Sequence, residues 1–376
     1  MQLFAARSPH LPHFSIGPRL RRAFPTPALL TPVAAGVDIS DASIKWLSLV
    51  PYKSGWKVGE YGTADIPPGI VVQGSIKDHS SLVRALTLLK KEARHLTHAH
   101  AALPEEAGYV FSMRVHNGSS RSEIMNMIEF SLEDRVPISL KDAVYDFDII
   151  GPVSGSPETE IAVVAFPLAI AESYVAAFEE AGIELLSLEI EARSIGRAVS
   201  NSKASVDEAT LLVDFGRTRT GFAILRRGIP IFTSTVEIGG DMIDRALTER
   251  LALAPEARDA FKNDQGVFAS DQKGAEAILG VAASLADEVA RLYRYSDTRR
   301  DEHGGKITPV TRVLLTGGSA NLKGITEYIA GKVQSEVERA DTWGNVCRYD
   351  EYIPPVSRQL SYGYATAIGL ALRCAL

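Results

Sequence analysis

A pattern of strand, aspartate, polar turn and strand occurs twice in this chain and restricts its fold more than any other feature. The first copy is Val37–Lys45, and the second is Val213–Gly221, 176 residues later (214 − 38). In each copy an aspartate, Asp38 or Asp214, ends an apolar strand just before a tight turn. A carboxylate there is costly unless it meets a cation or hydrogen-bond donors. The duplication therefore predicts two related β-rich lobes that face one cleft.

The composition is that of a globular chain with about two domains. The 376 residues are 45% hydrophobic and 23% charged, which excludes wholesale disorder. The net charge of −6 argues against a general binder of nucleic acid or of anionic membranes. The two cysteines, Cys347 and Cys374, are too few for a disulfide framework and are expected to be reduced thiols.

Changes of pattern along the chain divide it into an arm, two lobes and an inserted module. Before Asp38 there are four arginines and no acidic residue, and several prolines break the apolar run, so a flexible basic arm is expected. The predicted division is arm 1–33, first lobe 34–64 and 151–200, inserted α+β module 65–150, second lobe 207–238 and 300–376, and second-lobe subdomain 239–299, with a linker at 200–207.

Hydrophobic periodicity predicts the elements within each part. Alternating residues predict strands over Gly36–Val50, Trp56–Ile66, Thr210–Leu225 and Ile229–Ile238. Helical spacing predicts helices over Ser80–Arg94, Ser119–Asp134, Gly239–Leu251 and Gly274–Ser296, the last two separated by a polar loop. The final helix, Ser361–Leu376, is apolar nearly all round and is expected to be buried.

The residues after the repeated strands are those that a nucleotide site needs. Phosphates need backbone N–H groups and hydroxyls, Mg²⁺ needs carboxylates, and a close backbone approach needs glycine. The two turns and two later glycine segments, Thr316–Ala320 and Gly239–Asp241, supply these groups. Asp38 and Asp214 are the magnesium candidates. The P-loop, the dinucleotide-binding fingerprint and the nucleophile-elbow pattern do not occur in the sequence.

An ordered series of motifs resembles the PilM family, the actin-like cytoplasmic proteins of type IV pilus assembly, over about residues 34–376. The cell-division protein FtsA is a more distant relative. The motifs are Gly36–Ser40, Ile66–Val71 with Gly74–Asp78, Ala102–Pro104, Glu129–Pro137, Tyr145–Phe147, Glu189–Ala192, Glu237–Asp241 and Leu315–Leu322. The resemblance implies an α/β chain with the duplicated, ribonuclease-H-like two-lobe fold of actin-like ATPases and an inserted α+β module in the first lobe.

The resemblance also implies a site for ATP and Mg²⁺, with weak or no ATPase activity. Glu191, where such folds cross between lobes, would orient water. The first phosphate loop would be Asp38, Ser40, Asp41, Ala42, Ser43 and Lys45, and the second Asp214, Gly216, Arg217, Thr218, Arg219 and Thr220. Gly317, Gly318 and Ser319 would border the adenosine, Gly239 and Gly240 the ribose, and Glu288 and Arg291 the adenine.

Two residues of the first loop depart from the family pattern. Ser40 stands where glycine is usual, and Asp41 stands where a hydroxyl residue is usual. An acid beside phosphate is unfavourable unless it turns outward, helps the metal or meets a cation. Arg217 and Arg219 of the second loop are the candidates to offset it.

The implied partner is the N-terminal cytoplasmic peptide of a PilN-like inner-membrane protein. It would bind as an extended chain in a groove between the first lobe and module 65–150. The chain would then be a cytoplasmic scaffold of type IV pilus assembly, or of a related type II secretion-like machine. It would lie at the inner membrane indirectly, linked to the pilus motor ATPases, and self-association stays open.

Other interpretations of the same residues remain. Asp38 and Asp214 can cap hairpin turns, and Gly317–Gly318 can be a plain strand-to-helix turn. His95, His98 and His100 suggest a metal site, although a solvated loop is the favoured interpretation because no familiar ligand motif accompanies them. A small-molecule kinase of the same superfold and an FtsA-like membrane-associated polymer are the alternative functions.

Overall fold

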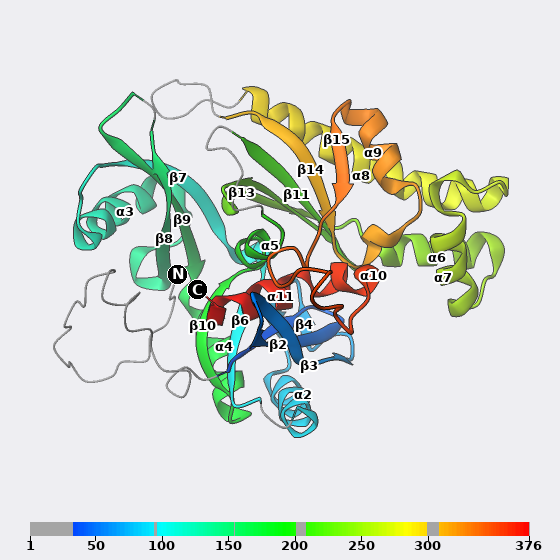
Figure 1. Cartoon of the computed structure of the whole chain (residues 1–376), viewed down its shortest axis with the longest axis horizontal. Coiled ribbons are helices and arrows are strands. Elements are labelled where there is room, and N and C mark those ends of the chain that lie inside the picture. Colours follow the sequence, from blue (N-terminus) through cyan, green and yellow to red (C-terminus); the bar gives the residue numbers. More distant parts are fainter. Residues whose placement is uncertain (1–32, 94–95, 154, 201–207, 299–307, 376) are drawn as a thin grey trace.

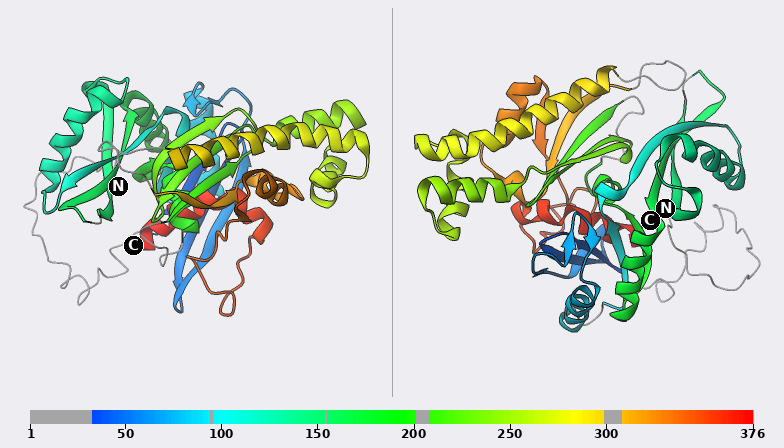
Figure 2. Two further views of the ribbon diagram at one scale, coloured as in Figure 1. Left: turned by 90° about the horizontal axis from the view of Figure 1, so that it is seen from above. Right: turned by 180° about the vertical axis from the view of Figure 1, so that it is seen from behind.

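The computed structural model describes residues 33–93, 96–153, 155–200, 208–298 and 308–375. The expected arm (1–33) and linker (200–207) thus lie almost wholly outside the described residues. Within the described ranges the chain forms two five-stranded sheets, a three-stranded sheet and a two-stranded hairpin, with helices around them (Figures 1 and 2).

The first sheet has the strand order β10-β6-β1-β2-β3. β1 pairs antiparallel with β2, and β2 pairs antiparallel with β3. β6 runs parallel to both β1 and β10. The bounds are β1 Ala35–Ile39, β2 Ser43–Tyr52, β3 Gly55–Asp65, β6 His98–Leu103 and β10 Glu184–Ile190.

The second sheet repeats this topology with the order β15-β14-β11-β12-β13. β11, β12 and β13 form the antiparallel meander, and β14 runs parallel to β11 and β15. The bounds are β11 Ala209–Phe215, β12 Thr220–Arg226, β13 Ile229–Val236, β14 Val310–Thr316 and β15 Glu336–Arg339. Each strand of one sheet therefore has a counterpart in the other, which confirms the two-lobe duplication that the repeat predicts.

The helices of the first lobe cover its sheet on two sides. α2 (His79–Glu92) contacts α4 (Leu168–Glu180), and α4 contacts β10. α5 (Glu191–Val199) contacts β6 and β10 of the first sheet and β12 and β13 of the second. Because α5 touches both sheets, it is the crossing element between the lobes. The short β4 (Val71–Val72) and β5 (Ser75–Ile76) form the hairpin before α2.

Helices also pack on the second sheet, as Figure 2 shows. α8 (Gln272–Thr298) contacts α6 (Gly240–Leu251), α9 (Ile325–Val333) and β14. The expected polar loop before α8 contains α7 (Pro255–Asp264) and the 3₁₀ turn η4 (Gly266–Phe268) instead. Pro255 suits the first helical position because its missing N–H has no intrahelical partner there.

The three-stranded sheet, β7-β9-β8, and α3 form the inserted module. A capping box at Ser120 and Glu123 starts α3, which buries Ile124, Ile128 and Leu132 against the sheet. The bounds are β7 Tyr109–His116, α3 Arg121–Arg135, η3 Leu140–Asp142, β8 Ala143–Pro152 and β9 Glu158–Pro167.

Several elements differ from the expected module boundaries of 65–150: β4, β5 and α2 fall within those bounds but pack beside α4 in the first lobe, and two longer strands are exchanged between the parts. β6 belongs to the first-lobe sheet, whereas β9, expected in the first lobe, is the central strand of the module. The composition of β6 and β9 does not reveal which sheet each strand joins, because pairing is set by distant partners.

The C-terminal helix also differs from its expected place in the second lobe. α11 (Ala365–Ala371) packs on β1, β2 and β6 and on α5, all in the first lobe. A Cβ at Gly36 would lie 2.0 Å from the Ala367 carbonyl oxygen, so only glycine permits this approach. The expectation that this segment is buried is confirmed. α10 (Arg358–Ser361), η6 (Tyr362–Tyr364) and η7 (Leu372–Ala375) flank α11.

Two of the three clustered histidines lie in β6 rather than in a solvated loop. His98 Nε2 lies 3.2 Å from a carboxylate oxygen of Glu184, and buried His100 contacts the Ser187 hydroxyl through Nδ1 at 2.7 Å. His95 lies outside the described residues. The expected loop is wrong here because alternation with alanine makes this stretch a strand. No helix among the described residues has the length and hydropathy to cross a bilayer.

Candidate functional site

The two predicted turns face one cleft between the lobes. Asp38 is the last residue but one of β1, and Asp214 is the last but one of β11. The cleft has a volume of about 450 Å³. The structure brings these predicted site residues together along it: Asp38, Ser40, Asp41, Ala42, Ser43, Lys45, Glu191, Asp214, Gly216, Arg217, Thr218, Arg219, Gly240, Gly317, Gly318 and Ser319.

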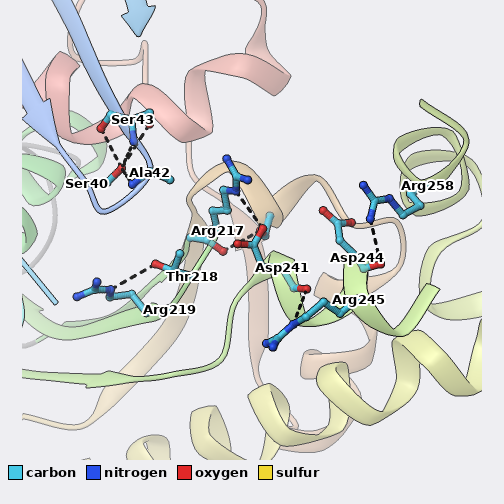
Figure 3. A network of polar contacts seen from close by, with 12 residues as sticks. Ser40, Ala42, Ser43, Arg217, Thr218, Arg219, Asp241, Asp244, Arg245 and Arg258 are labelled. Carbon is cyan, nitrogen blue, oxygen red and sulfur yellow. Dashed lines mark hydrogen bonds and ion pairs between the residues drawn. The ribbon is translucent and has the colours of Figure 1, made fainter. Parts of the chain in front are cut away.

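The first turn is held by the side chain of Ser40 (Figure 3). Its Oγ accepts hydrogen bonds from the backbone N–H groups of Ala42 (3.4 Å) and Ser43 (3.1 Å). Lys45 Nζ, on β2, donates to Ser43 Oγ at 3.0 Å. The serine that replaces the usual glycine therefore closes the turn locally, and Lys45 supplies a positive charge beside it.

The Asp41 carboxylate is bound by hydrogen-bond donors from other segments of the chain. Its oxygens accept hydrogen bonds from the backbone N–H groups of Gln73 (3.1 Å) and Gly74 (3.2 Å). Arg219 of the second turn forms an ion pair with the same carboxylate. The negative charge at this position is thus offset, in the way expected for Arg219. Arg217 instead pairs with Asp241 at 3.0 Å, and Figure 3 shows the two arginines extending in different directions.

A glycine-rich segment that follows β14, residues 317–319, also lines the cleft. Gly317 has φ +87°, and a Cβ there would lie 2.7 Å from Asp214 Oδ1, so this position requires glycine. Ser319 Oγ donates to the Gly216 carbonyl oxygen at 2.8 Å. The segment therefore joins the second turn to the 3₁₀ helix η5 (Gly318–Asn321).

Four predicted residues do not line the cleft. Thr220 is buried and donates to the Ile238 carbonyl oxygen at 2.6 Å. Gly239 packs on the second turn, where a Cβ would lie 2.4 Å from the Arg217 carbonyl oxygen. Glu288 and Arg291 pair with each other on α8. Thr220 and Gly239 thus pack behind the second turn and support its conformation. The Glu288–Arg291 pair of α8 lies away from the cleft that the described residues form.

The cleft holds more buried acid than base. Burial and the nearby Asp38 carboxylate raise the pKa of Asp214 to about 7. Burial raises the pKa of Asp38, opposed by Lys45, and burial with neighbouring acids raises the pKa of Glu191 well above its usual range. Carboxylates so placed favour the binding of a cation.

Magnesium fits this donor set only in combination with another ligand. Among the described residues, no group of three or more histidine, cysteine, aspartate or glutamate side chains is arranged to hold a metal ion. Mg²⁺ in proteins is commonly held by one or two carboxylates together with substrate phosphates and water. Asp38 and Asp214 are suited to that shared coordination.

The acidic residues of the cleft that sequence reasoning missed include Glu105 and Glu106 of η2 (Glu105–Ala107). Buried Glu105 accepts a hydrogen bond from the Ala192 N–H at the start of α5 (2.9 Å), and burial raises its pKa to about 7. Glu106 forms an ion pair with Arg219. The available signal was an acidic pair following the apolar segment that ends at Leu103, the same kind of signal as at Asp38.

Comparison with known proteins identifies relatives of this architecture. A family model described as type IV pilus assembly protein PilM matches residues 36–375. A solved chain of a "PilM-PilN type IV pilus biogenesis complex" superposes with a TM-score of 0.72 at 18% identity, covering 91% of this chain and 98% of that one. The ethanolamine utilization protein EutJ from Carboxydothermus hydrogenoformans superposes with a TM-score of 0.54 at 18% identity, covering 91% and 89%. The expected actin-like fold is confirmed.

Proposed function

The chain belongs to the PilM family of type IV pilus assembly proteins, and from this premise we propose that it binds ATP with Mg²⁺ between its lobes and serves as a scaffold. The observation that carries the proposal is the pair of matched turns across one cleft, each preceded by an aspartate. Closure of the lobes around the nucleotide then biases the binding of a protein partner.

Separate groups of the cleft take the parts of the ligand. The turns 40–42 and 216–219 and the side chain of Lys45 face the phosphates, and Gly317, Gly318, Ser319 and Gly240 border the nucleoside. Asp38 and Asp214 hold Mg²⁺, which neutralises phosphate charge when bound. Weak turnover, or none, is expected. Glu191 orients water, although its raised pKa favours the protonated form, which is a poor base.

The proposed partner is the N-terminal cytoplasmic peptide of a PilN-like inner-membrane protein. The solved relative is a PilM–PilN complex, which supports this class of partner. The peptide binds as an extended chain between the first lobe and the module of β7, β8, β9 and α3. In this arrangement the protein is cytoplasmic, reaches the membrane only through its partner and links it to the motor ATPases.

Calorimetry with Mg-ATP tests the nucleotide site. The wild-type protein should bind, and Asp214→Asn should weaken binding about tenfold or more in the presence of Mg²⁺ because one of two metal-facing carboxylates is lost. The weakening should shrink or reverse in EDTA, where Asp214 only repels phosphate. Asp287→Asn on α8, which removes an exposed ion pair with Lys332 of α9, is the matched control. A folded wild-type protein that does not bind Mg-ATP contradicts the proposal.

A further inference from the structure

Arg219 contacts both sides of the cleft at once. It lies in the second turn, and its guanidinium forms ion pairs with Asp41 of the first turn and with Glu106 of η2. The three side chains are only about one-fifth exposed. Ion pairs with so little exposure are less screened by water and salt than surface pairs. A single guanidinium therefore joins the two phosphate-facing turns to a third segment.

That third segment leads directly into the inserted module. η2 ends at Ala107, and β7, the first module strand, begins at Tyr109. β7 also contacts β13 of the second sheet, as Figure 1 shows. Glu106 is thus three residues before the first residue of the strand that leads into the module.

The surrounding backbone is packed tightly enough to transmit such a change. Asp41 binds the N–H groups of Gln73 and Gly74. A Cβ at Gly74 would lie 1.9 Å from Pro104 Cβ and 3.3 Å from a carboxylate oxygen of Glu106. The first turn, the 73–74 turn and the start of η2 therefore form one contiguous unit around Arg219.

A phosphate chain between the turns competes with Glu106 for Arg219. Guanidinium has five N–H donors and binds phosphate through paired hydrogen bonds. From this competition we infer that Arg219 couples nucleotide binding to the inserted module. Bound phosphates break the ion pair between Arg219 and Glu106, and the segment that leads from η2 into β7 is then no longer held to the second turn. The inference rests on the proposed nucleotide site and adds its regulation.

The inference predicts that removing the Glu106 charge tightens Mg-ATP binding, whereas a purely structural role for Glu106 would not. If the Arg219–Glu106 pair opposes nucleotide binding, Glu106→Gln removes the opposition and tightens Mg-ATP binding about fivefold. Simple damage to the site would weaken binding instead. Glu160→Gln is the matched control, because Glu160 of β9 pairs with Arg226 of β12 and also joins the module to the second lobe, away from the turns.

Calorimetry and hydrogen exchange together test the inference. In the wild-type protein Mg-ATP should increase amide exchange in residues 105–116, and this increase should be absent in Glu106→Gln and retained in Glu160→Gln. Unchanged or weaker Mg-ATP binding by Glu106→Gln overturns the inference and leaves the proposed function intact. Failure of the folded wild-type protein to bind Mg-ATP overturns both.

Discussion

Asp38 and Asp214 occupy equivalent positions in the two sheets. Across the antiparallel pairs, Asp38 lies opposite Lys45 and Asp214 lies opposite Gly221, each seven residues further along the chain. The two partners differ in charge, so Asp38 has a cation directly opposite it on the neighbouring strand and Asp214 does not. This asymmetry agrees with the pKa of Asp214, which burial and Asp38 raise to about 7.

The raised pKa of Asp214 predicts a pH dependence of stability without ligand. Between its usual pKa, near 4, and about 7 the unfolded chain loses this proton while the folded chain retains it, so the free energy of unfolding falls as pH rises. Asp214→Asn removes this contribution, which is about 4 kcal/mol at pH 8 for a pKa raised to about 7. Urea unfolding should show similar stabilities at pH 4 and a more stable variant at pH 8. Parallel pH profiles for the two proteins would contradict the assignment.

The sequence repeat predicted the two related sheets, but it did not predict which lobe each outer element packs against. The strands around Asp38 and Asp214 were predictable because local alternation and turn residues define a meander. The all-round apolar character of the last helix indicated burial, but burial alone does not say which lobe supplies the contact. The first lobe supplies the contact for α11, because Gly36 has no side chain and the helix can therefore pack directly against its backbone.

The residues of the cleft that lie in the two repeated turns were predictable from the sequence. The pairing of Asp41 with Arg219, 178 residues away, was predicted from the sequence, whereas the two N–H groups at Gln73 and Gly74 that also bind Asp41 were found only in the structure. Glu105 and Glu106 were missed for a related reason: they adjoin Asp214 and Arg219 only through the association of the lobes.

Gly36→Ala should destabilise the protein strongly. The added methyl would lie 2.0 Å from the Ala367 carbonyl oxygen and 2.7 Å from the Ala371 nitrogen, so α11 must shift. We expect a loss of about 3 kcal/mol or more in the free energy of unfolding. The control is Gly280→Ala on α8, where a Cβ meets no atom within 4 Å, and there a gain of about 0.5–1 kcal/mol is expected. Equal urea midpoints for the two variants would refute this account.

A buried ion network should contribute to stability in the first lobe. The Glu189 carboxylate has no exposed surface, and both its oxygens accept hydrogen bonds from Arg197 (2.5 and 2.7 Å). Arg197→Met removes the bidentate partner of this buried charge and leaves the ion pair with Arg373 (2.7 Å), so it should cost about 2–3 kcal/mol, less than a fully uncompensated charge. Arg348→Met, which removes a solvent-exposed pair with Asp350, should leave the free energy of unfolding nearly unchanged because water and salt screen the pair. Urea unfolding compares the two, and a cost below that of Arg348→Met would exclude a stabilising network.

A substitution at Gly318 tests nucleotide binding without disturbing the fold. It lines the cleft, and a Cβ there meets no atom within 4 Å, so a larger side chain can be accommodated by the fold. Gly318→Leu should therefore leave the thermal midpoint nearly unchanged and weaken Mg-ATP binding about tenfold, because the side chain occupies space proposed for the nucleoside. Gly331→Leu, at a similarly open position on α9, should preserve both properties. Calorimetry with thermal unfolding measures the pair, and full affinity in a well-folded Gly318→Leu protein would place the nucleoside elsewhere.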